Sequence, residues 1–273
     1  MDPELSGQKL KAGNKKLQTF WLLLSAFWML AYPGCEKSPS EEFAPVLNVH
    51  GLLRKGNDTC QIQVDRSYAI TESSGQFFSG ATVRLWKGND TWEFCYDTKS
   101  NYLSREAVTV QSRDTFYLQV SAPGFETVWA RTVVPDTFSI TKPVGGDTVS
   151  VDSLLCWTRS RNCGGYLLAV GDTSGTWFIG ALPDSLAGRL PMFFLAGAPG
   201  EQYTLHLLAL DTNYYNWMIM AAADTVGVRQ NRVSGLVGGM GVFGSAVECS
   251  VRVFVKQPVR VSEGYSLSRQ SNR

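Results

Sequence analysis

Few residues in this chain combine the type and the spacing that catalysis or metal binding requires. The two histidines, His50 and His206, both lie inside runs typical of strands. A catalytic histidine needs a nucleophile and an orienting carboxylate, and the sequence contains no G-x-S-x-G or H-E-x-x-H motif. Asp211 and Asn213 could offer oxygen ligands to a cation, but Asp-x-Asn after a strand is commonly an Asx turn. We therefore expect no enzymatic activity, no cofactor and no metal site.

A glycine-rich segment, Gly239-Met240-Gly241-Val242-Phe243-Gly244, formally matches the dinucleotide motif G-x-G-x-x-G. That motif binds a pyrophosphate only where it opens a helix whose N-terminus faces the phosphates. Here the chain continues into a strand-like run from Ser245 onward, so no such helix is expected. The glycines instead predict a bend or bulge beside the last strand.

Aromatic residues are the remaining candidates, because they bury a large area at small entropic cost when a partner binds. Tyr214, Tyr215 and Trp217 form the densest aromatic cluster outside a clear strand alternation. They either contact a partner or fill the core of the second half of the chain. Trp86 is the other candidate, since it shares the polar phase of its strand with Arg84.

The N-terminal segment predicts export from the cytoplasm. Residues 9–19 carry four lysines, and residues 20–30 are free of charge and apolar except for Ser25, which is the pattern of a secretory signal. The segment ends in Gly34-Cys35, which resembles a bacterial lipoprotein signal, in which the cysteine is acylated and becomes the new N-terminus. Tyr32 and Pro33 depart from the usual pattern, so a secreted protein with an unmodified Cys35 is the alternative. The polar stretch up to residue 45 is typical of a tether.

Five further cysteines remain once Cys35 is assigned to the lipid anchor: Cys60, Cys95, Cys156, Cys163 and Cys249. An odd number leaves at least one free thiol in an oxidising compartment. A Cys60–Cys95 disulfide is conceivable, but Cys95 is out of phase with its apolar neighbours and is expected to point outward while Cys60 points inward. Scattered free thiols are the alternative.

Short runs with a period of two predict strands throughout the rest of the chain. The ranges are 60–65, 81–85, 92–94, 116–120, 128–134, 148–151, 154–157, 166–170, 177–179, 203–210 and 247–255. Gly-Asn-Asp-Thr occurs at 56–59 and 88–91 and predicts two hairpin turns. We find no helical periodicity after the signal. The expected fold class is all-β, with two tandem β-sandwich domains at 46–135 and 136–259 and a flexible tail at 260–273.

Composition limits the classes of function. The chain of 273 residues is 44% hydrophobic and 18% charged, which suits folded domains better than disorder. Its formal net charge of +1 at pH 7 argues against a strongly basic nucleic-acid-binding protein, so no nucleic-acid partner is expected.

Several segments together resemble the DUF4249-type family of bacterial envelope lipoproteins. They are Leu47–Leu53, Ser79–Leu85, Phe116–Val120 with Pro123–Phe125, Ala130–Pro135, Ala209–Tyr215 and Gly238–Gly244. The resemblance implies attachment to the outer membrane, periplasmic or at the cell surface, through a palmitate-type lipid on Cys35. Because members are often encoded beside TonB-dependent receptors, it also implies a role next to such a transporter. It implies no catalytic residues.

Each half also resembles a known fold. The first half is similar to prealbumin-like carboxypeptidase-regulatory domains, and the second to fibronectin type III or Ig-like domains, with Trp157 expected in its core. Likeness of fold carries no functional claim. We expect a membrane-anchored protein with a binding or accessory role at a TonB-dependent outer-membrane transporter. A structural or adhesive envelope protein is the alternative, and no small-molecule ligand is identified.

Overall fold

The computed structural model describes residues 43–56, 59–68, 78–186, 188–195, 202–223 and 235–256. The chain divides into two compact units, Met1–Ala44 and Pro45–Arg273, and all of the described strands and helices belong to the second. The predicted signal at 1–34, Cys35, most of the tether and the tail at 260–273 lie outside the described residues. Among the described helices, none is both long enough and apolar enough to cross a membrane.

The second unit is an all-β structure, as predicted. Its described strands are β1 Leu47–Arg54, β2 Gln61–Arg66, β3 Thr82–Lys87, β4 Asp90–Tyr96, β5 Asn101–Ser104, β6 Thr115–Ser121, β7 Val128–Val133, β8 Ile140–Lys142, β9 Thr148–Val149, β10 Leu154–Trp157, β11 Gly165–Gly171, β12 Thr176–Pro183, β13 Arg189–Pro191, β14 Gln202–Leu210, β15 Leu236–Val237 and β16 Met240–Val255. Short 3-10 turns occupy Asp184–Leu186 and Phe193–Leu195, and helix α2 spans Thr212–Ala223.

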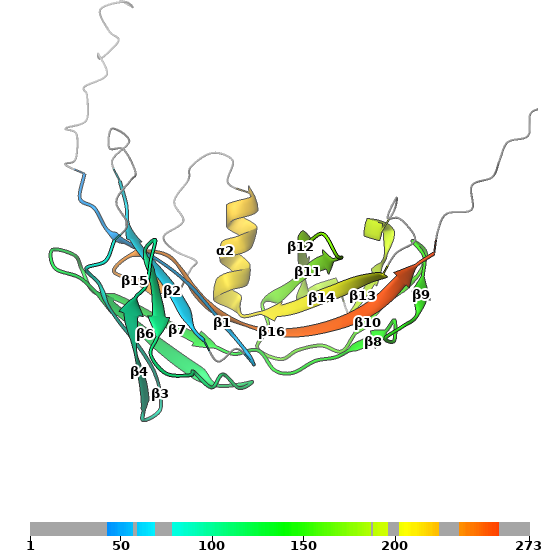
Figure 1. The fold of residues 1–273 in the computed structure, drawn as a ribbon, viewed down its shortest axis with the longest axis horizontal. Coiled ribbons are helices and arrows are strands. Elements are labelled where there is room, and N and C mark those ends of the chain that lie inside the picture. The colour runs from blue at the N-terminus through cyan, green and yellow to red at the C-terminus, as the bar shows by residue number, and fades with distance from the viewer. Residues whose placement is uncertain are drawn as a thin grey trace, which may run out of the picture. The chain divides into compact units, whose positions relative to one another are not determined.

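Most strands belong to one mixed sheet in the order β12-β11-β14-β16-β1-β2-β5-β4-β3-β6-β7-β15, with β9 also paired to β16. Strands β13, β10 and β8 form a second, smaller sheet. The long strand β16 pairs in parallel with β1 near its start and with β9 at its end (Figure 1). Strand β7 also packs against β16, so the large sheet folds over itself in a sandwich-like arrangement.

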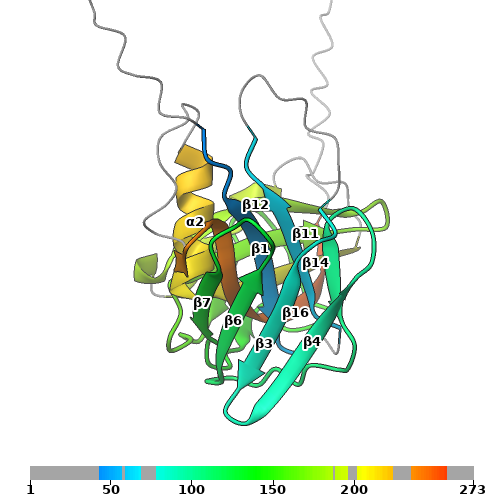
Figure 2. The ribbon, with the colours of Figure 1, turned by 90° about the vertical axis from the view of Figure 1, so that its left-hand side faces the viewer.

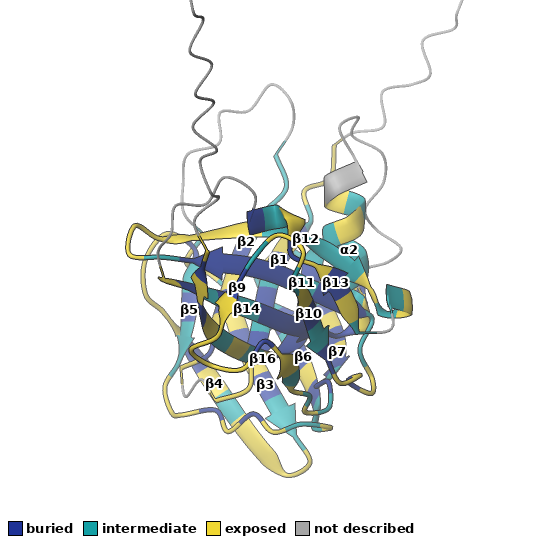
Figure 3. Ribbon diagram, turned by 90° about the vertical axis from the view of Figure 1, so that its right-hand side faces the viewer, coloured by how far each residue is buried: buried dark blue, intermediate teal, exposed yellow. Residues whose placement is uncertain are grey.

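Two main hydrophobic cores lie between these layers. The first gathers residues of β1 to β7 and also takes Phe243 and Val247 from β16. The second gathers β10, β11 and β14 and takes Val253 and Val255 from the far end of the same strand. Phe138 packs against both cores. Figure 3 shows the buried residues concentrated along these inner strands. The domain boundary at residues 135/136 stays a prediction. Strand β16 contributes side chains to both cores.

The alternation predicted for the end of the chain is confirmed, and the strand is longer than expected. Val247, Val253 and Val255 are buried, whereas Glu248 and Arg252 on the other phase are exposed. From Val242 to Val247 every residue is buried, on both phases. The glycine-rich segment therefore opens a strand rather than a helix, as expected. Backbone dihedral φ is +101° at Gly241, a conformation that glycine adopts readily.

Both faces of β16 are buried there because α2 covers one of them (Figures 1 and 2). The expectation that no helix follows the signal is wrong. Helix α2 has no charged residue, so it lacks the polar stripe that makes a helix visible as a period of 3.6 residues. Gly244 gives the helix room, since a Cβ added there would lie 2.6 Å from the Cβ of Tyr214.

Candidate functional site

Trp86 lies on the outer face of β3, as its phase predicts. Inward on the same strand, Val83 and Leu85 are buried in the first core. Tyr117 of β6 lies directly opposite Trp86 in the sheet register, and the two rings stack with centroids 5.5 Å apart. The strands that carry them lie at the front of the view in Figure 2.

A third aromatic residue, Trp129 of β7, completes this group. Its ring meets that of Trp86 edge to face at 6.1 Å. Trp129 is 46% exposed and Tyr117 is 37% exposed, while their strand neighbours Val128 and Phe116 are fully buried. We call Trp86, Tyr117 and Trp129 the aromatic face. Outward side chains of this size are a common mark of an interaction surface.

The alternation in the sequence also puts Tyr117 and Trp129 on the outward phase of their strands, although Trp86 is the only one of the three among the predicted binding residues. Each follows the alternation of its own strand as clearly as Trp86 does. What the alternation does not show is that these strands are neighbours in a register that brings the rings together.

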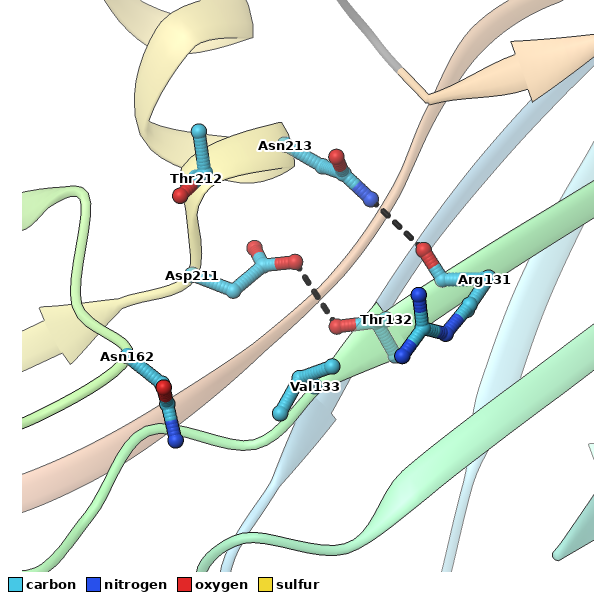
Figure 4. Close-up of a pocket in the computed structure, with 7 residues that line it drawn as sticks. All are labelled: Arg131, Thr132, Val133, Asn162, Asp211, Thr212 and Asn213. Carbon is cyan, nitrogen blue, oxygen red and sulfur yellow. Dashed lines mark hydrogen bonds between the residues drawn. The ribbon is translucent and has the colours of Figure 1, made fainter.

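A pocket of about 280 Å³ lies at the end of the aromatic face (Figure 4). Strand β7, the turn before β11 and the start of α2 supply its lining, which consists of Arg131, Thr132, Val133, Asn162, Asp211, Thr212 and Asn213. Arg131 faces Tyr117 across the β6–β7 register. The aromatic face and the pocket therefore share one side chain.

Beneath the pocket a buried polar network fixes the start of α2. The Tyr214 backbone N–H donates to Asp211 Oδ1 at 3.0 Å, and the Thr132 hydroxyl donates to Asp211 Oδ2 at 2.7 Å. Because that proton goes to the carboxylate, the hydroxyl of Ser245 donates to Thr132 Oγ1, 2.7 Å away. Asp211 thus caps the helix, the arrangement that the Asx-turn prediction anticipated in part.

Burial raises the pKa of the Asp211 carboxyl, and the hydrogen bonds from Tyr214 and Thr132 oppose that shift. The carboxylate is 4% exposed and lies at the positive end of the helix dipole. Asn213 adds a second attachment, since its Nδ2 donates to the Arg131 carbonyl oxygen at 2.7 Å. The corner between β14 and α2 is thereby held against β7 and β16.

Three side chains of the pocket keep hydrogen-bonding capacity to spare. Within the described structure, the Arg131 guanidinium, the Asn162 amide and the Thr212 hydroxyl make no hydrogen bond or ion pair, and all three residues are exposed. Asn162 adopts a φ of +56°, in the left-handed region that asparagine tolerates. The pocket therefore presents donors on both sides of Val133.

The other predicted binding residues lie elsewhere, on α2. Tyr214, Tyr215 and Trp217 are half-buried, and the two tyrosines pack with Met218 on a third, small apolar cluster around Leu208. The cluster also contains Leu52, Leu167, Leu210 and Ala246. These three residues therefore lie on a helix and outside the second core, and their contact with a partner stays a prediction. The structure does not bring them together with Trp86.

Both histidines serve contacts within the fold. The ring of His50 meets Tyr214 and Trp217 edge to face, and burial lowers its pKa. His206 Nδ1 lies 2.7 Å from Glu248 Oε1, and Arg54 pairs with the same carboxylate. Burial alone would raise the pKa of Glu248, but His206 and Arg54 together lower it.

All five described cysteines are free thiols. Cys60 is buried and Cys95 is exposed, which confirms their predicted orientations. Burial raises the pKa of Cys60 to about 12 and that of Cys163 to about 11, so neither is a ready nucleophile near neutral pH. Among the described residues, no three His, Cys, Asp or Glu side chains are grouped to hold a metal ion.

Comparison with protein families identifies the class. The family model described as "Domain of unknown function (DUF4249)" matches residues 36–217, and the chain belongs to this family. A search of curated proteins finds no match.

Solved structures give distant likenesses. The three N-terminal domains of the Highly Immunogenic Outer Capsid protein (Hoc) of bacteriophage RB49 are 9% identical, over 78% of this chain and 70% of that one, with a TM-score of 0.24. A segment of two fibronectin type III domains from chicken tenascin is 11% identical, over 60% of this chain and 90% of that one, with a TM-score of 0.20. At these TM-scores the likenesses carry no argument about the present chain.

Proposed function

We propose that this protein is a binding protein of the bacterial cell envelope, anchored to the membrane by a lipid on Cys35. The observation that carries the binding role is the aromatic face, with Trp129 and Tyr117 exposed beside the unpaired Arg131. Tryptophan, tyrosine and arginine are the residue types that most often dominate binding energy at interfaces. The proposal assigns binding rather than catalysis.

We further propose that it acts as an accessory or ligand-capture subunit beside a TonB-dependent outer-membrane transporter. The support is its membership of the DUF4249 family together with the lipoprotein-like segment ending in Gly34-Cys35. A lipid tether would keep the protein at the membrane and raise its local concentration, so that modest contacts suffice.

Crosslinking in living cells followed by purification from envelope membranes tests this proposal. Wild-type protein is expected to recover a TonB-dependent receptor, and Trp129→Ser is expected to recover less. Phe178→Ser is the matched control, because Phe178 is a 70% exposed aromatic residue on β12, at the other end of the sheet order.

Two results would count against the proposal. Equal recovery of the receptor with the Trp129→Ser and Phe178→Ser variants would show that the aromatic face does not contact the receptor. Failure to recover any receptor, with normal growth of a deletion strain on limiting nutrients, would favour a structural or adhesive envelope protein. Labelling with radioactive palmitate separately tests the anchor, since Cys35→Ala should abolish incorporation and release the protein from the membrane fraction.

A further inference from the structure

Arg131 links two features of different chemistry into one surface. It lies opposite Tyr117 on the outer side of the sheet, with Trp129 two residues earlier on the same phase of β7. It also lines the pocket with Asn162 and Thr212 (Figure 4). A ligand bound across this surface would meet flat apolar rings at one end and hydrogen-bonding groups at the other.

Arg131 is also the unpaired cation of this surface among the described residues. Arg84 lies 3.9 Å from Glu93, and the ammonium of Lys87 lies 2.9 Å from Asp114. The nearby Asp211 carboxylate is 4% exposed, and its two oxygens accept from protein groups. A free guanidinium favours a carboxylate or similar oxyanion, with which it forms two parallel hydrogen bonds.

Few ligand classes combine all of these complements. Pyranose rings have apolar C–H faces that pack on aromatic rings and rims of hydroxyl groups that bind amide and hydroxyl side chains. A neutral sugar leaves Arg131 without an ionic partner, whereas a sugar that carries a carboxylate satisfies it. The pocket volume of about 280 Å³ is near the lower end of small-ligand sites, which suits one small unit of a larger ligand.

We propose that the aromatic face and the pocket together bind a carboxylated saccharide. A sugar ring packs on Trp129 and Tyr117, its carboxylate pairs with Arg131, and hydroxyl groups enter the pocket to bond Asn162 and Thr212. This inference rests on the proposed binding role and names the ligand class for the same surface.

Calorimetric titration of the full-length protein with a short oligogalacturonate tests the ligand class. The matched ligand is its methyl ester, which keeps the rings and removes the negative charges. Loss of a charge-assisted pair with arginine is expected to weaken binding of the ester about tenfold or more. Equal binding of the two ligands, or binding of neither, would overturn the proposal.

Variants assign the two ends of the site. Arg131→Gln should abolish the preference for the acidic form, and Trp129→Ser should weaken both forms about tenfold. Phe178→Ser should change neither affinity. Arg131→Lys keeps the charge without the planar fork, so an intermediate preference is expected, and thermal unfolding checks that each variant is folded.

Free galacturonate distinguishes a small-molecule source from a polymer. Tighter binding of the oligomer indicates a polysaccharide, and equal binding of the monomer indicates a free sugar acid; both outcomes support the class. An acidic peptide that binds where the saccharides do not would overturn it. Recovery of a transporter without saccharide binding would leave the proposed function intact and refute only the ligand class.

Discussion

The aromatic face and helix α2 both present large aromatic side chains, but they differ in what lies behind those side chains. Behind Trp86, Tyr117 and Trp129 stands a sheet whose other face already fills the first core. Behind the tyrosines of α2 lies a small apolar cluster that has no other cover among the described elements. The aromatic face is not needed to fill the first core, whereas the tyrosines of α2 cover the small apolar cluster.

The comparison shows why residue type alone does not identify a binding residue. An aromatic ring on the outward phase of a strand keeps part of its apolar area exposed to water after folding. A bound ligand can bury that area and gain the corresponding free energy. An aromatic ring on an uncharged helix recovers that area by packing on the sheet. The variants below should therefore separate loss of stability from loss of binding.

The largest loss of stability is expected for Asp211→Ala. This change removes the acceptor of the Tyr214 backbone N–H, which is the cap of α2, and it leaves the buried Thr132 hydroxyl without its acceptor. We expect the free energy of unfolding to fall by about 2–4 kcal/mol, from the cost of a lost cap and of unpaired buried groups. Urea unfolding measures it. Asp211→Asn keeps an acceptor and should lose much less, so equal losses in the two variants would show that the network is not what holds α2.

A smaller loss is expected for Trp217→Ala on α2. The ring of Trp217 packs on His50, with centroids 5.0 Å apart, and it is half-buried. Removing it should cost about 1–3 kcal/mol, below the value for a fully buried tryptophan. The variant should nevertheless keep the affinity of the aromatic face for its ligand. A parallel loss of affinity with normal stability would show that α2 itself contacts the partner.

Acidification should weaken the attachment of α2. Burial lowers the pKa of His50, so its neutral form is favoured in the folded state. The stability from this packing is fully present above the pKa of the unfolded histidine, about 6.5, and is lost as pH falls below that value and through the lower pKa of the folded state. Glu248 acts in the same direction at lower pH, because its folded pKa is lowered. The raised pKa of Asp211 acts in the opposite direction, since protonation relieves a buried charge.

Thermal unfolding as a function of pH checks this prediction. The wild-type midpoint should fall as pH drops below about 6.5, and the His50→Gln variant should show a flatter profile in that range. Asp211→Asn should keep the drop caused by His50. An unchanged profile in His50→Gln would assign the pH dependence to other groups.

The sequence predicted well which residues of a strand face inward or outward, but it did not predict which strands are adjacent in the sheet. Alternation placed Trp86 outward and Val247, Val253 and Val255 inward, because a half-buried strand has a strict period of two. It could not show that β3, β6 and β7 are adjacent, since pairing between distant strands depends on the whole topology. The role of Arg131 follows from that adjacency and was therefore missed.

Helix α2 escaped prediction for a different reason. No face of the helix carries a charged residue, so the sequence shows neither a helical nor a strand period of polar and apolar residues there. The available signal was Asp211 directly before the run, because aspartate is a preferred N-cap. The same signal is typical of an Asx turn, which has the same local hydrogen bond and no helix after it.

The smallest change in stability is expected for Trp129→Ser. Trp129 is 46% exposed on the outward phase of β7, so its removal opens no cavity. The free energy of unfolding should change by less than about 1 kcal/mol, the range of exposed strand substitutions. Its affinity for the ligand should fall about tenfold, whereas Trp217→Ala should show the reverse pattern. Urea unfolding and calorimetric titration of the same two preparations measure both quantities. If Trp129→Ser were the less stable of the two variants, the aromatic face would be a structural element and the assignment of the two regions would be inverted.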